Sequence, residues 1–346
     1  MNRNLIYIIL FLLGLNSFVG DNSYFVITQK DVQLQIPKDF PKPVYDFKEN
    51  KLTPEGFTLG RKLFYDPVLS KDSSVSCAFC HQRFAAFAHV DHTLSHGING
   101  LIGRRNVPPI QNMIWQKNFM WDGGINHLEV QPVSPMTNSA EMDETMAHSV
   151  YKLQQNKEYV TLFKKAFNDP HVSSENVLKA LAQFTGLMVS SNSKYDKYLR
   201  GEEKFTDQEL NGFKLFRLRC ENCHQEPLFT DNSFRNIGIK PDTALRDSGR
   251  MSITGLPSDY MKFKVPSLRN VELTYPYMHD GRFKNLYDVL DHYAKGIFFT
   301  NNFDEGIKKN VGSLSEDDKQ ALIAFLKTLT DKDFIYDKRF ADPNSR

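Results

Sequence analysis

The chain has 346 residues and a mass of 39.9 kDa, which is enough for two domains of ordinary size. It is 40% hydrophobic, 24% charged and 12% aromatic, a composition that supports a packed core and excludes a disordered tail protein. The formal net charge of +2 gives none of the strong basic character that a nucleic-acid partner or an anionic membrane surface would require.

Residues 1–20 have the pattern of a secretory signal peptide. Arg3 precedes an apolar run from Leu5 to Leu15, and small or polar residues then lead to Gly20. The run is shorter than the roughly 20 residues that a helix needs to span a bilayer. We therefore expect export to the periplasm with removal of the leader; its retention as an uncleaved N-terminal anchor is the alternative.

Residues 21–50 are rich in Pro, Lys and Asp and are predicted to form an extended arm. A helix is then expected from Thr53, because this capping hydroxyl residue is followed by Pro54 and the acidic Glu55. Apolar residues at helical spacing predict further helices at 141–155, 157–167, 173–191, 285–295 and 315–329. No segment shows the sustained alternation of a sheet.

All four cysteines belong to two copies of one motif. The copies are Cys77-Ala78-Phe79-Cys80-His81 and Cys220-Glu221-Asn222-Cys223-His224. Two sulfurs at this spacing reach the two vinyl groups of one porphyrin, and the adjacent imidazole then lies under the iron. Redox dithiols or one Cys₄ zinc site would leave both histidines unused, and 139 residues separate the pairs. The sequence predicts two covalent haem c groups, with His81 and His224 as proximal ligands.

The helix before each haem motif is also repeated. Gly60-x-Lys62-Leu63-Phe64 matches Gly212-x-Lys214-Leu215-Phe216, and Thr206 begins the second helix as Thr53 begins the first. The chain is thus predicted to be mostly α, with an N-terminal cytochrome c domain at 51–195 and a C-terminal one at 196–346. The long loops at 82–140 and 225–280 are expected to wrap the haems.

Outside the haem motifs, the chain resembles the bacterial dihaem cytochrome c peroxidases and their MauG relatives over about residues 52–330. In the first unit the matching segments are Gly100-x-x-Gly103-Arg104-Arg105-Asn106-Val107-Pro108, Met120-Trp121-Asp122-Gly123, and Leu128-Glu129-x-Gln131-x-x-x-Pro135 with Glu141-Met142. In the second unit they are Phe229-Thr230-Asp231-Asn232-x-Phe234-x-Asn236-Ile237-Gly238, Pro266-x-Leu268-Arg269-Asn270, and Leu273-Thr274-Tyr275-Pro276-Tyr277-Met278-His279-Asp280-Gly281.

The resemblance implies that peroxide reacts at the first haem, with Gln131, Pro135 and Glu141 over its open face. Cleavage of the O–O bond needs a base that moves a proton from peroxide to the departing oxygen, and a carboxylate with a pKa raised by burial suits this role. Gln131 would hydrogen-bond peroxide, and Pro135 would narrow the pocket. Without the resemblance, Glu141 reads more simply as an acid in the first turn of the helix at 141–155.

Some members of the family rest with a histidine on the first haem. His89, His92 and His96 lie in the corresponding loop, but the position that matches the blocking ligand falls at or near Gly97. We therefore expect a five-coordinate first haem that needs no prior reduction, and solvated loop positions for the histidines.

The second haem has Tyr293 as its predicted distal ligand, with Met278 and His292 as alternatives. In the peroxidases that the chain resembles, the axial Met lies fourteen residues after the His of the His-Asp-Gly motif, and this count from His279 reaches Tyr293. Tyrosine there is typical of the MauG branch. A phenolate favours ferric and higher oxidation states, whereas thioether sulfur favours ferrous iron. The simpler alternative is that Tyr293 has no ligand role and only packs in the hydrophobic core as part of the helix at 285–295.

The resemblance also implies a position between the two haems for Trp121, where an indole can pass charge between the porphyrins; a packing role is compatible with this. It further implies one calcium ion between the domains, bound by Asn106 and the carbonyls of Thr274 and Pro276. Amide and carbonyl oxygens suit this hard cation.

Three functions fit these features. The first is a peroxidase that reduces hydrogen peroxide with electrons from a small cytochrome or cupredoxin; the second is a MauG-type oxidase that uses peroxide to modify a partner protein; the third is a dihaem electron carrier. Glu141 and Gln131 over an open iron argue against the carrier. Tyr293 favours the MauG branch, although Leu218 stands where members that mature methylamine dehydrogenase carry a Trp. We expect a MauG-like dihaem peroxidase without a nucleic-acid partner, and leave a homodimer open.

Overall fold

The computed structural model describes residues 26–344, so the predicted leader and the first residues of the arm lie outside the described part. The α-helices are α1 (Pro54–Tyr65), α2 (Cys77–Cys80), α3 (Val133–Thr137), α4 (Met146–Gln155), α5 (Lys157–Phe167), α6 (Ser174–Gly186), α7 (Lys194–Leu199), α8 (Asp207–Arg219), α9 (Met251–Thr254), α10 (Leu286–Lys295), α11 (Glu305–Val311), α12 (Glu316–Lys327) and α13 (Lys332–Tyr336). Short 3₁₀ helices are η1 (Pro67–Leu69), η2 (Arg83–Ala85), η3 (Ile98–Gly100), η4 (Met113–Trp115), η5 (Pro257–Asp259), η6 (Val271–Leu273) and η7 (Lys338–Phe340). Within residues 26–344, no helix is long and apolar enough to cross a membrane.

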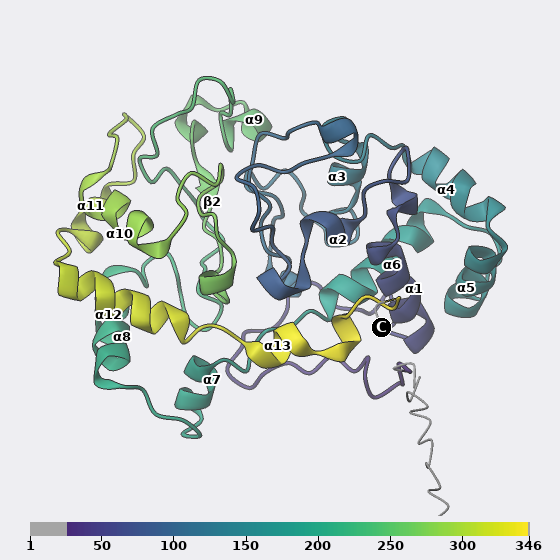
Figure 1. Cartoon of the computed structure of the whole chain (residues 1–346), viewed down its shortest axis with the longest axis horizontal. Helices are drawn as coiled ribbons and strands as arrows, with labels where there is room; N and C mark the ends of the chain where they lie inside the picture. Colours follow the sequence, from purple (N-terminus) through teal and green to yellow (C-terminus); the bar gives the residue numbers. More distant parts are fainter. Residues whose placement is uncertain (1–25, 345–346) are drawn as a thin grey trace, which may run out of the picture.

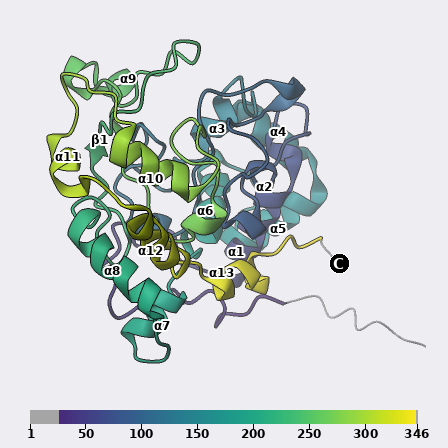
Figure 2. The same ribbon diagram turned by 60° about the vertical axis from the view of Figure 1, so that its left-hand side comes forward.

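The fold is mostly helical, as predicted. Two groups of helices lie side by side: α1 to α6 on the right of Figure 1 and α8 with α10 to α12 on the left. Figure 2 shows the same division from another direction. The described residues contain one small sheet, the antiparallel pair β1 (Phe234–Arg235) and β2 (Phe263–Lys264). These two-residue strands are too short to leave an alternating pattern in the sequence.

The two groups are built around the same helix contact. A Cβ atom at Gly60 of α1 would lie 1.9 Å from the carbonyl oxygen of Ala180 in α6, and one at Gly212 of α8 would lie 1.9 Å from that of Ala321 in α12. Glycine therefore lets each helix that precedes a haem motif approach its partner closely. The repeated Gly-x-Lys-Leu-Phe sequence thus marks the same packing position in both halves.

Two of the predicted helices need correction at their ends. The helix predicted at 141–155 begins only at Met146, where Thr145 caps it by accepting a hydrogen bond from the backbone N–H of His148. Residues 141–145 instead fold back towards α3, with the N–H of Glu144 donating to the carbonyl of Met136. Glu141 is therefore not a first-turn acid. The helix predicted at 173–191 ends at Gly186.

The long loops contain a second repeat that periodicity does not reveal. Residues 107–125 and 265–283 share the sequences Val-Pro-x-x-x-Asn and Met-x-Asp-Gly at one constant spacing. In both copies the Asn, the Met and the Gly have positive φ; these residues are Asn112, Met120 and Gly123 in the first copy and Asn270, Met278 and Gly281 in the second. Each copy closes with the same backbone hydrogen bond of 2.7 Å, from Phe119 to Ile125 and from Tyr277 to Phe283.

Both ends of the described chain tie the two groups together. Residues 26–50 form no helix or strand. The carbonyl of Pro41 accepts a hydrogen bond of 2.7 Å from Trp115 Nε1 in the first unit, and the guanidinium of Arg269 in the second unit lies 4.8 Å from the centre of the Phe40 ring. At the other end, Phe334, Ile335 and Phe340 pack in the hydrophobic cluster of the first group. The C-terminal segment, which the sequence assigns to the second unit, therefore returns to the first.

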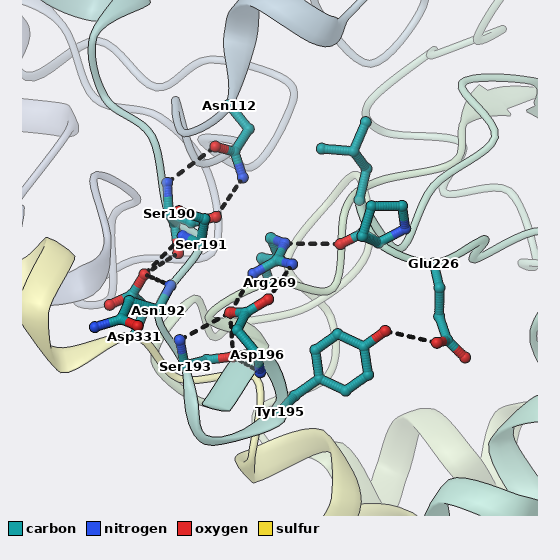
Figure 3. A network of polar contacts seen from close by, with 12 residues as sticks. Asn112, Ser190, Ser191, Asn192, Ser193, Tyr195, Asp196, Glu226, Arg269 and Asp331 are labelled. Carbon is teal, nitrogen blue, oxygen red and sulfur yellow. Dashed lines mark hydrogen bonds and ion pairs between the residues drawn. The ribbon is translucent and has the colours of Figure 1, made fainter. Parts of the chain in front are cut away.

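A buried polar network joins the linker at 190–196 to both groups (Figure 3). Arg269, which is 0% exposed, donates to both carboxylate oxygens of Asp196 at 2.8 and 2.9 Å. Ser190 exchanges backbone hydrogen bonds with the side-chain amide of Asn112, and its hydroxyl donates to Asp331 at 3.0 Å. The linker is therefore held in one position by groups from both halves.

We predict that Arg269→Met lowers the free energy of unfolding by about 3–5 kcal/mol, because it leaves the Asp196 carboxylate buried without its partner. Chemical denaturation of the haem-loaded protein measures this loss. Arg217→Met is the matched control: Arg217 pairs with Glu226 but its side chain is 51% exposed, so its loss should cost about 0–1 kcal/mol. Equal costs for the two variants would contradict the prediction.

Candidate haem sites and the residues between them

The first haem motif opens into a cavity of about 620 Å³. Cys77 and Cys80 of α2 line it together with His81. The same walls include Gln131, Pro135 and Glu141, which come from α3 and its flanking loops. The structure therefore brings together the attachment residues and the three residues predicted to face peroxide. A cavity of this size lies in the ordinary range for a bound organic group.

The second haem motif opens into a cavity of about 200 Å³, lined by Cys220, Cys223 and His224. Two of the three candidate distal ligands, Met278 and Tyr293, are on its wall. His292 is not: its Nε2 forms a hydrogen bond of 2.9 Å with the carbonyl of Ile237. Burial raises the pKa of Tyr293, so its phenol ionises only with help from a nearby cation.

Both proximal histidines are oriented in the same way. The Nδ1 atom of His81 lies 2.8 Å from the carbonyl oxygen of Phe87, and that of His224 lies 3.1 Å from the carbonyl oxygen of Phe229. Burial lowers the pKa of His81 to about 4 and also lowers that of His224, so both rings are neutral. A neutral ring that donates through Nδ1 keeps Nε2 free for a metal. The residues present therefore fit two c-type haems.

Trp121 lines both cavities, and its Nε1 donates to the carbonyl of Asn106 at 2.9 Å. The side chain is therefore fixed between the two sites. Lys264 of β2 also lines both cavities, although the sequence analysis did not select it. Its only signal in the sequence is its place immediately before the second Val-Pro-x-x-x-Asn segment.

Glu141 is held by its backbone and by two neighbours. Its carbonyl accepts a hydrogen bond of 2.8 Å from the N–H of Ile98, and Ser95 Oγ lies 3.5 Å from its carboxylate. Burial raises the pKa of Glu141, while hydrogen bonds from Ser95 and Asn138 oppose that rise. A carboxylate with a raised pKa is better suited than an exposed one both to accept and to release a proton.

Pro135 and Tyr293 occupy matching places in the two repeats. Each lies fifteen residues after the Met of its Met-x-Asp-Gly loop, counted from Met120 and Met278 respectively. Each also lines the cavity of its own unit. Where the second unit has a phenol able to ligate iron, the first has a side chain with no donor atom. This difference favours an open iron position in the first cavity.

The three loop histidines are placed differently from one another. His96 lines the first cavity, whereas His89 and His92 are not on its wall. At Gly97 an added Cβ atom would lie 2.2–2.4 Å from backbone atoms of Ala140 and Glu141. The position matched to a blocking ligand therefore has no room for a side chain in this arrangement of the loop.

The predicted calcium ligands lie on the wall of the second cavity. Asn106 donates through Nδ2 to the carbonyl of Thr93 at 3.0 Å, which leaves its Oδ1 available. Among the residues that the structure describes, the Oδ1 of Asn106 and the carbonyls of Thr274 and Pro276 accept no hydrogen bond. Oxygens of this kind suit a hard cation. The described part contains no cluster of three or more His, Cys, Asp or Glu able to hold a metal.

Comparison with known proteins gives a consistent result. Residues 54–204 match the family described as di-haem cytochrome c peroxidase. The chain is 35% identical to methylamine utilization protein MauG of Methylorubrum extorquens over 303 residues, covering 85% of this chain and 82% of the relative. It is also 35% identical to cytochrome c551 peroxidase of Nitrosomonas europaea over 277 residues, which is 79% of each chain.

Among solved structures, a MauG-like protein associated with microbial copper homeostasis superposes with a TM-score of 0.79 at 32% identity. The superposition covers 90% of this chain and 99% of that one. The sequence relatives and the superposed structure thus indicate the same family as the two haem motifs and the two cavities do. The chain belongs to the dihaem cytochrome c peroxidase and MauG family of oxidoreductases, with two cytochrome c domains and two haems.

Proposed function

We propose that this protein is a MauG-like dihaem peroxidase that reduces hydrogen peroxide at the first cavity. The observation that carries the proposal is that the half-buried Glu141 shares the wall of the first cavity with Pro135, the residue that takes the place of the second unit's Tyr293. Cys77 and Cys80 would attach the first haem and Cys220 and Cys223 the second, with His81 and His224 beneath the two irons. When bound, the haems supply the open iron position and the capacity to store oxidising equivalents.

Glu141 then acts as the proton carrier of the reaction. Its carboxylate takes a proton from one oxygen of peroxide and returns it to the other, which leaves as water. Gln131 orients peroxide by a hydrogen bond; in the structure its Nε2 lies 3.9 Å from the sulfur of Met120. Complete reduction of one peroxide takes two electrons and two protons and yields two waters. Pro135 limits the space for other molecules.

Trp121 provides the route between the two sites, because it is the one indole that lines both cavities. Tyr293 is the distal ligand that we propose for the second iron, with Met278 as the alternative on the same wall. Asn106, Thr274 and Pro276 would hold one calcium ion. The free oxygens of these three residues support that assignment.

The reducing partner is a small electron-donor protein, and exported residues 21–346 would meet it in the periplasm. A second function, peroxide-driven modification of a protein substrate, is favoured by Tyr293. However, Leu218 is 69% exposed on α8, at the position where a surface Trp would be needed to relay oxidation to methylamine dehydrogenase. Maturation of that particular substrate is therefore disfavoured. A simple electron carrier is disfavoured because Glu141 and Gln131 line the first cavity, where a carrier would need a second strong iron ligand.

We predict that Tyr293→Phe changes the ligand field of the second haem and leaves that of the first unchanged, because Tyr293 lines only the second cavity. Electron paramagnetic resonance of the oxidised protein resolves the two irons. Met278→Leu is the control and should keep the spectrum. The opposite result, a spectrum altered only by Met278→Leu, would transfer the ligand role to Met278.

Replacement of Glu141 by Gln should slow the reaction with peroxide by about 10²–10⁴-fold, the usual contribution of a general acid–base group, and leave both haems attached. Stopped-flow absorbance measures the rate. Glu129→Gln is the control: Glu129 accepts a hydrogen bond from Tyr45 and does not line the first cavity. A wild-type rate in Glu141→Gln would remove Glu141 from the mechanism.

The peroxide rate should also fall as the pH falls, since Glu141 must be deprotonated to accept a proton. Because burial raises the pKa of Glu141, the midpoint should lie above the usual glutamate range. Ser95→Ala removes a hydrogen bond that lowers this pKa and should move the midpoint further upward. Ser134→Ala, which also changes the cavity wall, should leave it in place. Identical pH profiles for all three proteins would contradict the assignment.

A further inference from the structure

The two repeated loops bind each other reciprocally. The N–H of Asn106 donates to the carbonyl of His279 at 2.7 Å, and the N–H of Lys264 donates to the carbonyl of Trp121 at 2.8 Å. Asn106 and Lys264 each stand immediately before a Val-Pro-x-x-x-Asn segment, and Trp121 and His279 each follow the Met of a Met-x-Asp-Gly loop. The interface between the units therefore has approximate twofold symmetry, with Lys264 as the counterpart of Asn106.

The symmetry extends to the groups around these two residues. Lys264 Nζ donates to the Oε1 of Gln116 at 2.5 Å and to the carbonyl of Asn118 at 2.8 Å. By the same spacing, the counterparts of Gln116 and Asn118 are Thr274 and Pro276. These are the two residues that, with Asn106, present oxygens that accept no hydrogen bond among the described residues.

The two sides of the interface thus have corresponding groups of oxygen atoms that differ in one respect, the presence of a cationic donor. On one side, the Oδ1 of Asn106 and the carbonyl oxygens of Thr274 and Pro276 accept no hydrogen bond from the described residues. On the other, an ammonium group already occupies the corresponding place. Lys264 has no carboxylate within ion-pairing distance among residues 26–344, and Asp122 is the one charge that favours its protonated form. Burial lowers the pKa of Lys264 to about 7, and its Nζ donates to both neighbouring oxygens, the Oε1 of Gln116 and the carbonyl of Asn118.

We propose that Lys264 is a built-in cation that takes, in the first unit's loop, the place that a metal ion takes in the second unit's loop. Lys264 thereby acts as a positioning residue for Trp121: its ammonium fixes residues 116 and 118, and its backbone N–H fixes residue 121. Three contacts from one residue hold the loop that carries the proposed relay, and none of them requires a metal. Among the described residues, no cationic side chain donates to the carbonyls of Thr274 or Pro276 in the loop that carries His279.

This arrangement makes a directional prediction about metal removal. Chelation should loosen the loop at 274–283 and leave the loop at 116–125 ordered, whereas loss of Lys264 should do the reverse. An ammonium with its three donors satisfies amide and carbonyl oxygens much as a hard cation does. The inference uses the calcium site proposed above as its reference, but it requires nothing of peroxide turnover.

The test is hydrogen exchange by mass spectrometry on the haem-loaded full-length protein, with and without a calcium chelator. Lys264→Met should raise exchange in 116–125 at least tenfold and leave 274–283 unchanged. Lys262→Met is the matched control, because Lys262 pairs with Asp259 and lies two residues away. If Lys264→Met does not take up both haems, Lys264→Gln replaces it. Exchange in 116–125 equal to that of the Lys262 control would overturn the proposal.

A gain-of-function arm tests the symmetry directly. Lys264→Asn removes the ammonium and introduces the amide found at its counterpart, so the chelator-stripped variant should bind two calcium ions by calorimetry where the wild type binds one. One bound calcium in Lys264→Asn would overturn the equivalence of the two sites. A wild type that binds none would refute the calcium assignment, and the exchange measurement would then still decide the role of Lys264. Neither readout depends on reaction with peroxide.

Discussion

The structure depends on the pair of reciprocal backbone hydrogen bonds between the two units. One joins Asn106 to His279 and the other joins Lys264 to Trp121. Because the segment that begins at Asn106 or at Lys264 binds the other unit's Met-x-Asp-Gly loop, both cavities are lined in part by the same residues, among them Asn106, Trp121 and Lys264. Trp121 lines both cavities in this arrangement. Two further contacts stabilise the arrangement of the units. They are the buried ion pair of Arg269 with Asp196 and the hydrogen bond from Trp115 to the arm at 26–50.

Within this symmetric frame, a few substitutions make the units chemically different. Pro135 stands where Tyr293 stands in the other unit, so this position offers no donor atom in the first cavity and a phenol in the second. Trp121 stands where His279 stands, and Lys264 where Asn106 stands. The proposed function uses these differences: the first cavity would be the reactive site, and the second would hold the haem that shares its oxidising equivalents.

The sequence predicted most of what depends on local pattern. The haem attachment residues follow from spacing alone, and the helices α5 and α10 match their predicted ranges to within one residue. The loops at 107–125 and 265–283 were missed as structured elements, because positive φ at Asn112 and Met120 and bonds to the other unit leave no periodic signal. The prediction that Glu141 begins a helix was wrong. Its apolar neighbours continue the helical spacing, but the helix begins at Met146, where Thr145 provides the cap. Comparison of the two Val-Pro-x-x-x-Asn segments would have revealed the repeat, and with it Lys264.

The proposed function requires a first haem that is open and shares its oxidation with the second. Rapid mixing of the oxidised, unreduced protein with stoichiometric hydrogen peroxide tests it most directly, by Soret and near-infrared absorbance. We expect prompt loss of the ferric Soret band of both haems, with a near-infrared charge-resonance band. No reaction until one electron equivalent has been added would contradict it, and would indicate a blocked first haem with His96, the loop histidine on the cavity wall, as the blocking ligand.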